Sequence, residues 1–288
     1  MSVSGPRGRG GVAWGAREIE SDRLRFGGPA GGTDGNGRGD EGKDLGRVGP
    51  GSSARDGSVE GRRMTHGDDQ RVFVLERLFK CFDRVPDEGA HYSVQLCAEV
   101  PVKSDPMALV GWRGGENAGH TFLVLKKWRD GIGVTQCFGF YPLRRPSMWN
   151  PMKGVPSEIR DNEHHEINAA ITVELTAAGF LLVLEKALFL AANEYRLVDF
   201  NCSDFALTVF NCVRAEPIVL APFPVSLPVG IGSRKSSFTK VTSIGSTPQM
   251  LYATLYAMKN TGGPGAKDII IDLSHDTLAP PSFGECAE

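Results

Sequence analysis

The stretch NCSDFALTVF, residues 201–210, is the segment from which the fold is best inferred. It follows a short extended segment, Tyr195–Phe200, and its residues predict the start of a helix. Cys202 would then lie at the helix N-terminus, where free N–H groups and the positive end of the helix dipole stabilise a thiolate. The thiolate is the nucleophilic form of cysteine, so this position predicts a reactive Cys202.

A nucleophilic cysteine needs a base within hydrogen-bond reach, and the best upstream candidate is His120 in the motif GHTFL. The sequence predicts a β-hairpin here, with a strand at His120–Trp128, a turn at 129–131 and a return strand at Val134–Tyr141. Catalytic partners are adjacent in space and often distant in sequence. A Cys202–His120 pair is therefore the central prediction.

A third polar residue usually orients the imidazole of such a pair. Gln136 and Tyr141 are the candidates on the return strand, and Gln136 has the better side chain for accepting the ring N–H. Asn201 has two interpretations: it supports an oxyanion hole together with the Cys202 backbone N–H, or it is the helix N-cap. Asp204, in the first helical turn, is expected to cap the helix.

The remaining pattern predicts an α+β fold in which an antiparallel β-sheet packs against helices. Strands are expected at Tyr92–Pro101, Ile167–Leu175 and Asp268–Leu273, with a short extended piece at Met107–Trp112. Helices are expected within Asp69–Asp83 and at Ala177–Asn193 and Gln249–Lys259. Leu143–Arg160 is expected to form a surface loop, and the last dozen residues are expected to be loose.

Composition divides the 288 residues into three parts. Residues 1–65 are rich in Gly and Arg and should be disordered, or should reflect an over-extended translation start before Met64. Residues 66–222 form the predicted catalytic domain, and residues 223–288 a C-terminal extension with one helix. The formal net charge of −2 does not suggest a nucleic-acid partner, and no signal peptide or transmembrane segment is expected.

Other titratable side chains give weaker signals. The six cysteines show no CxxC pair, so most are expected to be small buried side chains and not a disulfide framework. His164 and His165 are adjacent, and neighbours on a strand point to opposite faces, so no metal site is expected. His66 and His275 lack supporting neighbours, and no cofactor is expected.

Three motifs together resemble a circularly permuted papain-like fold: GHTF at 119–122, FGFYP at 138–142 and NCSDFA at 201–206. This group includes permuted NlpC-type cell-wall peptidases, lecithin:retinol acyltransferase-like enzymes and bacterial effector domains. The resemblance covers about Tyr92 to Pro217 and implies Cys202 as nucleophile and His120 as base, with acyl transfer through a thioester.

The resemblance leaves three functions open. The first is a cysteine amidase or peptidase acting on peptides or peptidoglycan. The second is a lipid acyltransferase or phospholipase acting on lipid acyl groups. The third is a binding module in which Cys202 is inert. The absence of a signal peptide suggests cytoplasmic residence or export by a specialised secretion system, as with the effectors that the chain resembles. An effector of this kind would have a secretion-machinery or immunity partner.

Overall fold

The computed structural model describes residues 70–103, 106, 118–147, 150–220, 224–229, 237–242, 245–274 and 276–287. All of them belong to one unit of the chain, Gly61–Glu288. The predicted leader, the extended piece at Met107–Trp112, and the side chains of His66 and His275 lie outside the described residues.

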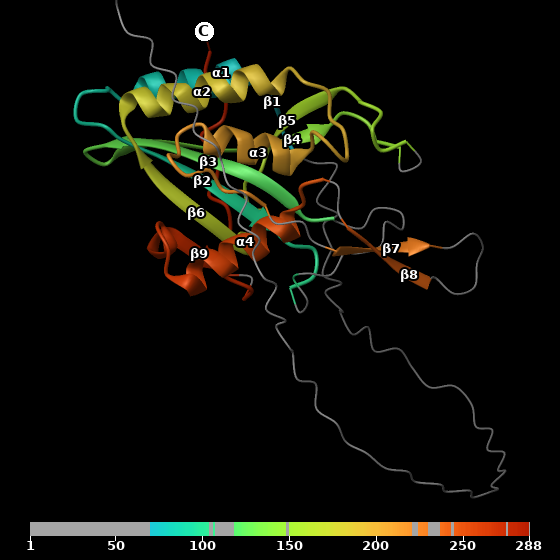
Figure 1. Cartoon of the computed structure of the whole chain (residues 1–288). Coiled ribbons are helices and arrows are strands. Elements are labelled where there is room, and N and C mark those ends of the chain that lie inside the picture. Colours follow the sequence, from blue (N-terminus) through green and yellow to red (C-terminus); the bar gives the residue numbers. More distant parts are fainter. Residues whose placement is uncertain are drawn as a thin grey trace, which may run out of the picture. The chain divides into compact units, whose positions relative to one another are not determined.

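The described chain is built on a seven-stranded antiparallel sheet (Figure 1). Its strands, in spatial order, are β1 (Val72–Phe73), β5 (Ser157–Asp161), β4 (Ile132–Pro142), β3 (His120–Arg129), β2 (His91–Glu99), β6 (Ala169–Leu175) and β9 (Ile269–Ile271). The predicted hairpin is formed by β3 and β4, joined at Asp130 and Gly131, both of which have positive φ. β7 (Pro224–Val229) and β8 (Ser237–Thr242) form a separate antiparallel pair. The α+β prediction is confirmed.

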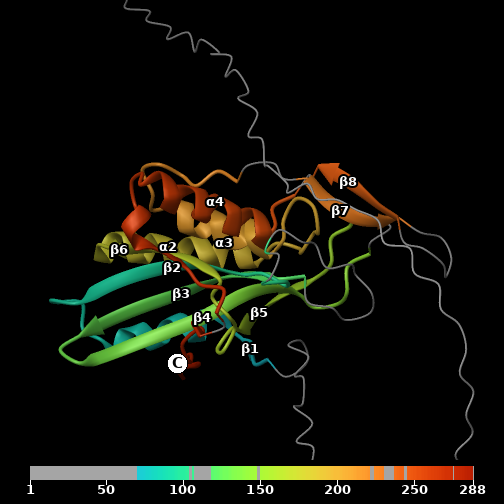
Figure 2. The ribbon, with the colours of Figure 1, turned by 90° about the horizontal axis from the view of Figure 1, so that it is seen from below.

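Three helices cover one face of the sheet: α2 (Ala177–Ala191), α3 (Cys202–Asn211) and α4 (Pro248–Thr261) (Figures 1 and 2). We call this the helical face. The short helix α1 (Leu75–Lys80) and the 3₁₀ turn η1 (Cys81–Arg84) pack beside α2 at the β4 end. Phe140 of β4 stacks on Phe205 of α3, with ring centroids 4.9 Å apart, and this contact fixes α3 against the sheet.

The two faces of the sheet follow from the alternation of side chains along each strand. On β3, Leu123 and Leu125 join the main core under the helices, whereas Phe122 and Val124 belong to a second, smaller apolar cluster. That second cluster also contains Ala279 from the C-terminal segment. We call its side of the sheet the open face, because no helix of the described chain packs on it.

Two predictions made from the sequence are wrong, one about the segment before β6 and one about the C-terminus. The region expected to be a surface loop, Leu143–Arg160, contains most of β5. This strand is too short and too polar to show a clear alternation of apolar and polar residues. The last dozen residues are not loose, because Cys286 is disulfide-bonded to Cys81 and Phe283 donates its backbone N–H to Thr135 O over 2.8 Å.

Within the described residues, helices are too short or too polar to cross a bilayer.

Candidate functional site

Cys202 is the first residue of α3, as the sequence predicts. Asn201 is its N-cap, and its side-chain oxygen accepts from the backbone N–H groups of Ser203 and Asp204. The Asp204 carboxylate accepts the Asn201 N–H in return, which completes a capping box. Of the two interpretations of Asn201, the structure therefore shows the cap, and the capping role of Asp204 is confirmed.

The surroundings of Cys202 do not favour its thiolate. The side chain is 8% exposed and lies in the main apolar core. Burial raises the pKa of the Cys202 thiol, although hydrogen bonds from the Thr121 backbone and from the Ser203 and Tyr195 hydroxyls oppose this. Burial has the larger effect, so the sulfur is a protonated thiol near neutral pH.

His120 lies on the other side of β3. Its neighbour Thr121 faces α3, where the Thr121 hydroxyl is 2.8 Å from the Ser203 hydroxyl. The His120 ring instead stacks on Tyr141, at a centroid distance of 4.2 Å, and lies 6.1 Å from the ring of Phe122, a member of the second apolar cluster. The imidazole is therefore on the open face and the thiol on the helical face.

The predicted Cys202–His120 pair is thus not formed in this structure. The physical reason is strand alternation: residue 120 must point away from α3 if residue 121 points toward it. The sequence patterns predict the correct elements for both residues, α3 and β3, but they do not determine which face of β3 the His120 side chain occupies.

Gln136 does not orient the imidazole either, and this prediction is wrong. Its side chain is fully buried, with Nε2 donating to Leu78 O and to Gly284 O, each over 2.9 Å. Its Oε1 accepts from the backbone N–H of Gly284 over 3.3 Å. Gln136 therefore fastens the C-terminal segment to α1 and β4.

The open face holds a buried polar cluster around His120, which we call the open-face cluster. Its members are Glu99, His120, Tyr141, Asn162 and His165. Glu99 ends β2, opposite His120 in the strand register, and its Oε2 is 2.6 Å from Nδ1 of His165. Asn162 follows β5 directly and donates from Nδ2 to the Tyr141 hydroxyl over 2.6 Å.

A tight turn brings His165 into this cluster. His164 has φ of +65°, a left-handed conformation that is uncommon outside glycine, and its side chain is exposed. His165 is buried beside it, with its ring centroid 5.8 Å from that of His120. Strained backbone of this kind is concentrated at functional sites. The two histidines thus differ in exposure because they lie in a turn, and not on a strand as the sequence analysis assumed.

Two polar atoms of the cluster have no hydrogen-bond partner among the described residues: His120 Nε2 and Asn162 Oδ1. Both lie against Gly139, where a Cβ would overlap His120 Nε2 and stand 2.5 Å from Asn162 Oδ1. Buried polar atoms normally have hydrogen-bond partners, so two neighbouring atoms without them need an explanation.

The imidazole of His120 is neutral near pH 7. Burial is the main cause that holds the pKa of His120 well below its ordinary value, with smaller effects from nearby His165 and Arg160. A neutral ring can accept a proton at one nitrogen and donate from the other. The neutral ring is therefore free to take a proton, although the same lowering of its pKa weakens it as a base.

No group of three or more metal-ligating side chains lies within ligating distance in the described chain. The sequence analysis identified His120, but it did not assign a role to Glu99 or Asn162. These side chains come from three separate strand ends, and only the strand order β5-β4-β3-β2 brings them together.

Comparisons of this chain with protein-family models, with curated proteins and with solved structures find no match.

Proposed function

We propose that the chain is a hydrolase that works by acid–base catalysis at the open-face cluster and does not use Cys202 as its nucleophile. The observation that carries the proposal is the buried, unpaired Nε2 of His120 beside a second imidazole that a carboxylate orients. Enzymes arrange pairs of titratable groups in different environments so that one takes a proton and the other gives one.

The roles follow from the contacts. His120 Nε2 is the base that takes a proton from an attacking water. His165 is held by Glu99 at Nδ1 over 2.6 Å, and its Nε2 contacts the side-chain amide of Gln70. His165 would supply the proton that the leaving group needs from Nε2, once the substrate displaces that amide. The Tyr141 ring stacks on the His120 ring, and its hydroxyl, which accepts from Asn162, would orient the reacting group. Tyr141 and Gln70 are half-buried, so the substrate would approach past them.

The substrate classes are those implied by the resemblance: a peptide, a peptidoglycan fragment or a lipid ester. A permuted papain-like architecture stays part of the proposal. It is supported by the order of a histidine-bearing strand, its return strand and a helix headed by cysteine. Within that architecture the open face, and not the helical face, would carry the chemistry.

Two substitutions test the proposal. The protein and its variants His120→Gln and Cys202→Ala are incubated with amide substrates, peptidoglycan fragments and phospholipid vesicles. We expect His120→Gln to lower turnover by about 100-fold or more, because loss of a general base typically has an effect of this size. Cys202→Ala should keep turnover within a few-fold of the wild type. His164→Gln, at an exposed neighbouring imidazole, is the matched control and should behave as the wild type.

The opposite pattern would overturn the proposal. Turnover lost in Cys202→Ala and kept in His120→Gln would restore the thiol mechanism, with a rearrangement that brings the two faces together. Absence of turnover with every substrate would favour the binding module. The near-complete burial of the cluster is the observation that supports that second candidate.

A further inference from the structure

The C-terminal segment, residues 277–286, runs along the wall of the open-face cluster. We call it the C-terminal strap. The Ala279 N–H donates to His165 O over 2.7 Å, and the His164 N–H donates to Ala279 O over 3.1 Å. The Ser282 hydroxyl donates to Asp161 Oδ1 over 2.8 Å. The strap therefore contacts the chain on both sides of Asn162, at the side chain of Asp161 and at the backbone of His164 and His165.

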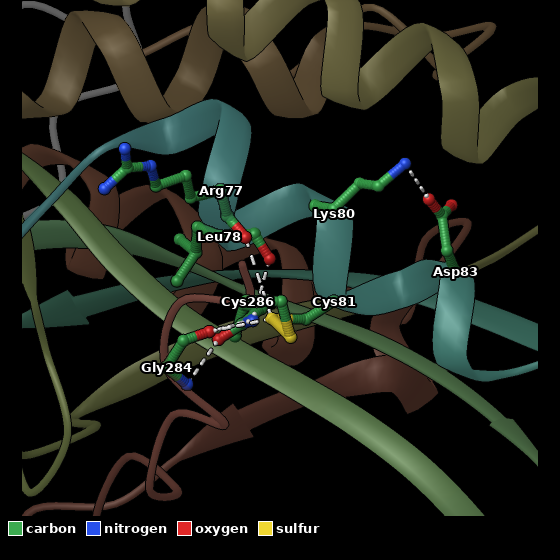
Figure 3. Close-up of a disulfide and its surroundings, with 8 residues drawn as sticks. Arg77, Leu78, Lys80, Cys81, Asp83, Gly284 and Cys286 are labelled. Atoms are coloured by element: carbon green, nitrogen blue, oxygen red, sulfur yellow. Dashed lines mark hydrogen bonds and ion pairs between the residues drawn. A yellow bond between two sulfur atoms is a disulfide. The ribbon is translucent and has the colours of Figure 1, made fainter. Parts of the chain in front are cut away.

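The far end of the strap is fastened to α1 and to η1 (Figure 3). Cys286 forms a disulfide with Cys81, and the Cys286 N–H donates to Arg77 O over 3.2 Å. Glu285 accepts from the Val74 N–H, and Gly284 exchanges two hydrogen bonds with the Gln136 side chain. Among these attachments of the strap, the disulfide is the covalent one.

The disulfide is placed where a reductant can reach it. Cys81 is buried, but Cys286 is half-buried and lines an open cavity of about 500 Å³ together with Lys80, Arg84 and Glu285. Asp83 lines the cavity as well and pairs with Lys80, so the two cationic side chains are balanced by two carboxylates. The opening of the cavity, and not its charge, gives an attacking thiolate its path to the disulfide.

We infer that the Cys81–Cys286 disulfide is a redox latch that controls the order of the open-face cluster through the C-terminal strap. A dithiol delivers two electrons and two protons to the disulfide, which becomes two thiols, while the dithiol becomes a disulfide. The strap end then loses its covalent anchor, and the hydrogen bonds that remain must hold residues 277–286 alone. The turn that carries Asn162 and His165 loosens with it.

The effect on order stands independently of catalysis, whereas control of turnover rests on the proposed function. In an oxidising compartment the latch is closed, and in a reducing compartment it is open. The hydrolytic site would therefore be assembled only where disulfides persist.

Hydrogen exchange on the full-length protein tests the latch. Amide exchange is followed by mass spectrometry with the disulfide intact and after reduction with dithiothreitol and capping of the thiols. We expect reduction to accelerate exchange by about tenfold or more in peptides covering 277–287 and 160–166, because a locally released segment exchanges through its own opening. Exchange in α2 should not change.

Three variants provide controls. Cys81→Ser and Cys286→Ser should each show the fast exchange without reductant and should not respond to dithiothreitol. Cys212→Ser removes a cysteine that is free in the structure and should respond as the wild type does.

Equal exchange of both peptides in the two redox states overturns the inference. Acceleration confined to 284–287, with 160–166 unchanged, also overturns it, because the disulfide would then be a local staple. The readout does not require turnover. An active His120→Gln variant would thus contradict the proposed function without touching the latch, and uniform exchange would contradict the latch alone.

Discussion

Cys202 shows how a single residue can stand at a helix N-terminus and still lie in surroundings that disfavour its thiolate. A helix N-terminus lowers the pKa of a thiol, but burial of Cys202 raises it and prevails. The predicted base, His120, lies on the opposite face of β3 from Cys202, because its neighbour Thr121 is the residue that faces α3. The chemistry of a residue thus depends on the face it occupies as much as on its position in an element.

The thiols should differ in reactivity. With the disulfide intact, iodoacetamide at neutral pH should alkylate Cys212 first, because it is half-exposed while Cys97, Cys137 and Cys202 are buried. Mass spectrometry of digested samples over a time course measures the order. Alkylation of Cys202 before Cys212 would show that the sulfur is accessible and activated, contrary to the structure.

His120 should make the stability of the fold depend on pH. An unfolded histidine titrates near 6.5, and burial holds the pKa of folded His120 well below that value. Below about pH 6.5 the unfolded state therefore binds more protons than the folded state, and the free energy of unfolding falls as pH falls. The loss reaches up to about 1.4 kcal/mol for each pH unit until the folded pKa is reached.

Urea unfolding at several pH values between about 7.5 and 5 measures this contribution, and the His120→Gln variant isolates it. The variant should lose less free energy of unfolding than the wild type over this interval. Parallel pH profiles for the two proteins would show that the imidazole protonates freely in the folded state.

Gly139 should tolerate no side chain. A Cβ there would overlap His120 Nε2 and press on Asn162 Oδ1, so Gly139→Ala should destabilise the fold by about 1–3 kcal/mol through overpacking. Gly133→Ala, on the same strand, is the control, since its nearest contact would be the Trp128 Cβ at 3.3 Å. Thermal unfolding of both variants measures the difference. Equal stability would mean that the ring of His120 moves aside without cost.

At the scale of elements, the capping residue of α3 does more than satisfy the backbone N–H groups at the start of the helix. The Asn201 side chain accepts from Ser203 N and Asp204 N, and its Nδ2 donates to Leu197 O over 3.1 Å and to Ser246 O over 2.9 Å. It therefore ties the start of α3 both to the preceding loop and to the segment that leads into α4.

Replacing Asn201 by Ala should cost about 2 kcal/mol, because it removes a cap and takes the amide donor from two partly buried carbonyls. Thr176→Ala at α2, where one capping bond to Gly179 N is lost, should cost about 1 kcal/mol. Chemical denaturation compares the two variants. A smaller effect at Asn201 than at Thr176 would contradict the role of its amide donors.

Elements were easier to predict than their pairing. Alternation and helical spacing predict β2, β3, β4, β6, α2, α3 and α4 within a few residues, since each has a long periodic pattern. β5 has five residues, SEIRD, with Ile159 as its one apolar side chain, so its sequence resembles a loop. The open-face cluster could not be predicted, because it depends on β5 pairing with β4 and on the face that each side chain of β3 occupies.

At the scale of the whole molecule, Cys81 and Cys286 form a long-range disulfide that the spacing of the cysteines in the sequence does not predict. They are 205 residues apart, and neither belongs to a motif. The disulfide ties the start of the described fold to its end, and in between the chain completes the sheet from β2 to β9. A cross-link over so long a segment limits the freedom of the unfolded chain strongly.

Removing this bond should lower the global free energy of unfolding by about 2–5 kcal/mol, as loss of a native disulfide typically does. Equilibrium unfolding in urea without reductant measures the change in Cys286→Ser. Cys212→Ser, which leaves the disulfide in place, should change stability by less than about 1 kcal/mol. Since the cross-link acts chiefly on the unfolded chain, the m-value should rise in Cys286→Ser as the unfolded state becomes less compact. An unchanged midpoint and m-value would mean that the strap and α1 separate before the sheet unfolds.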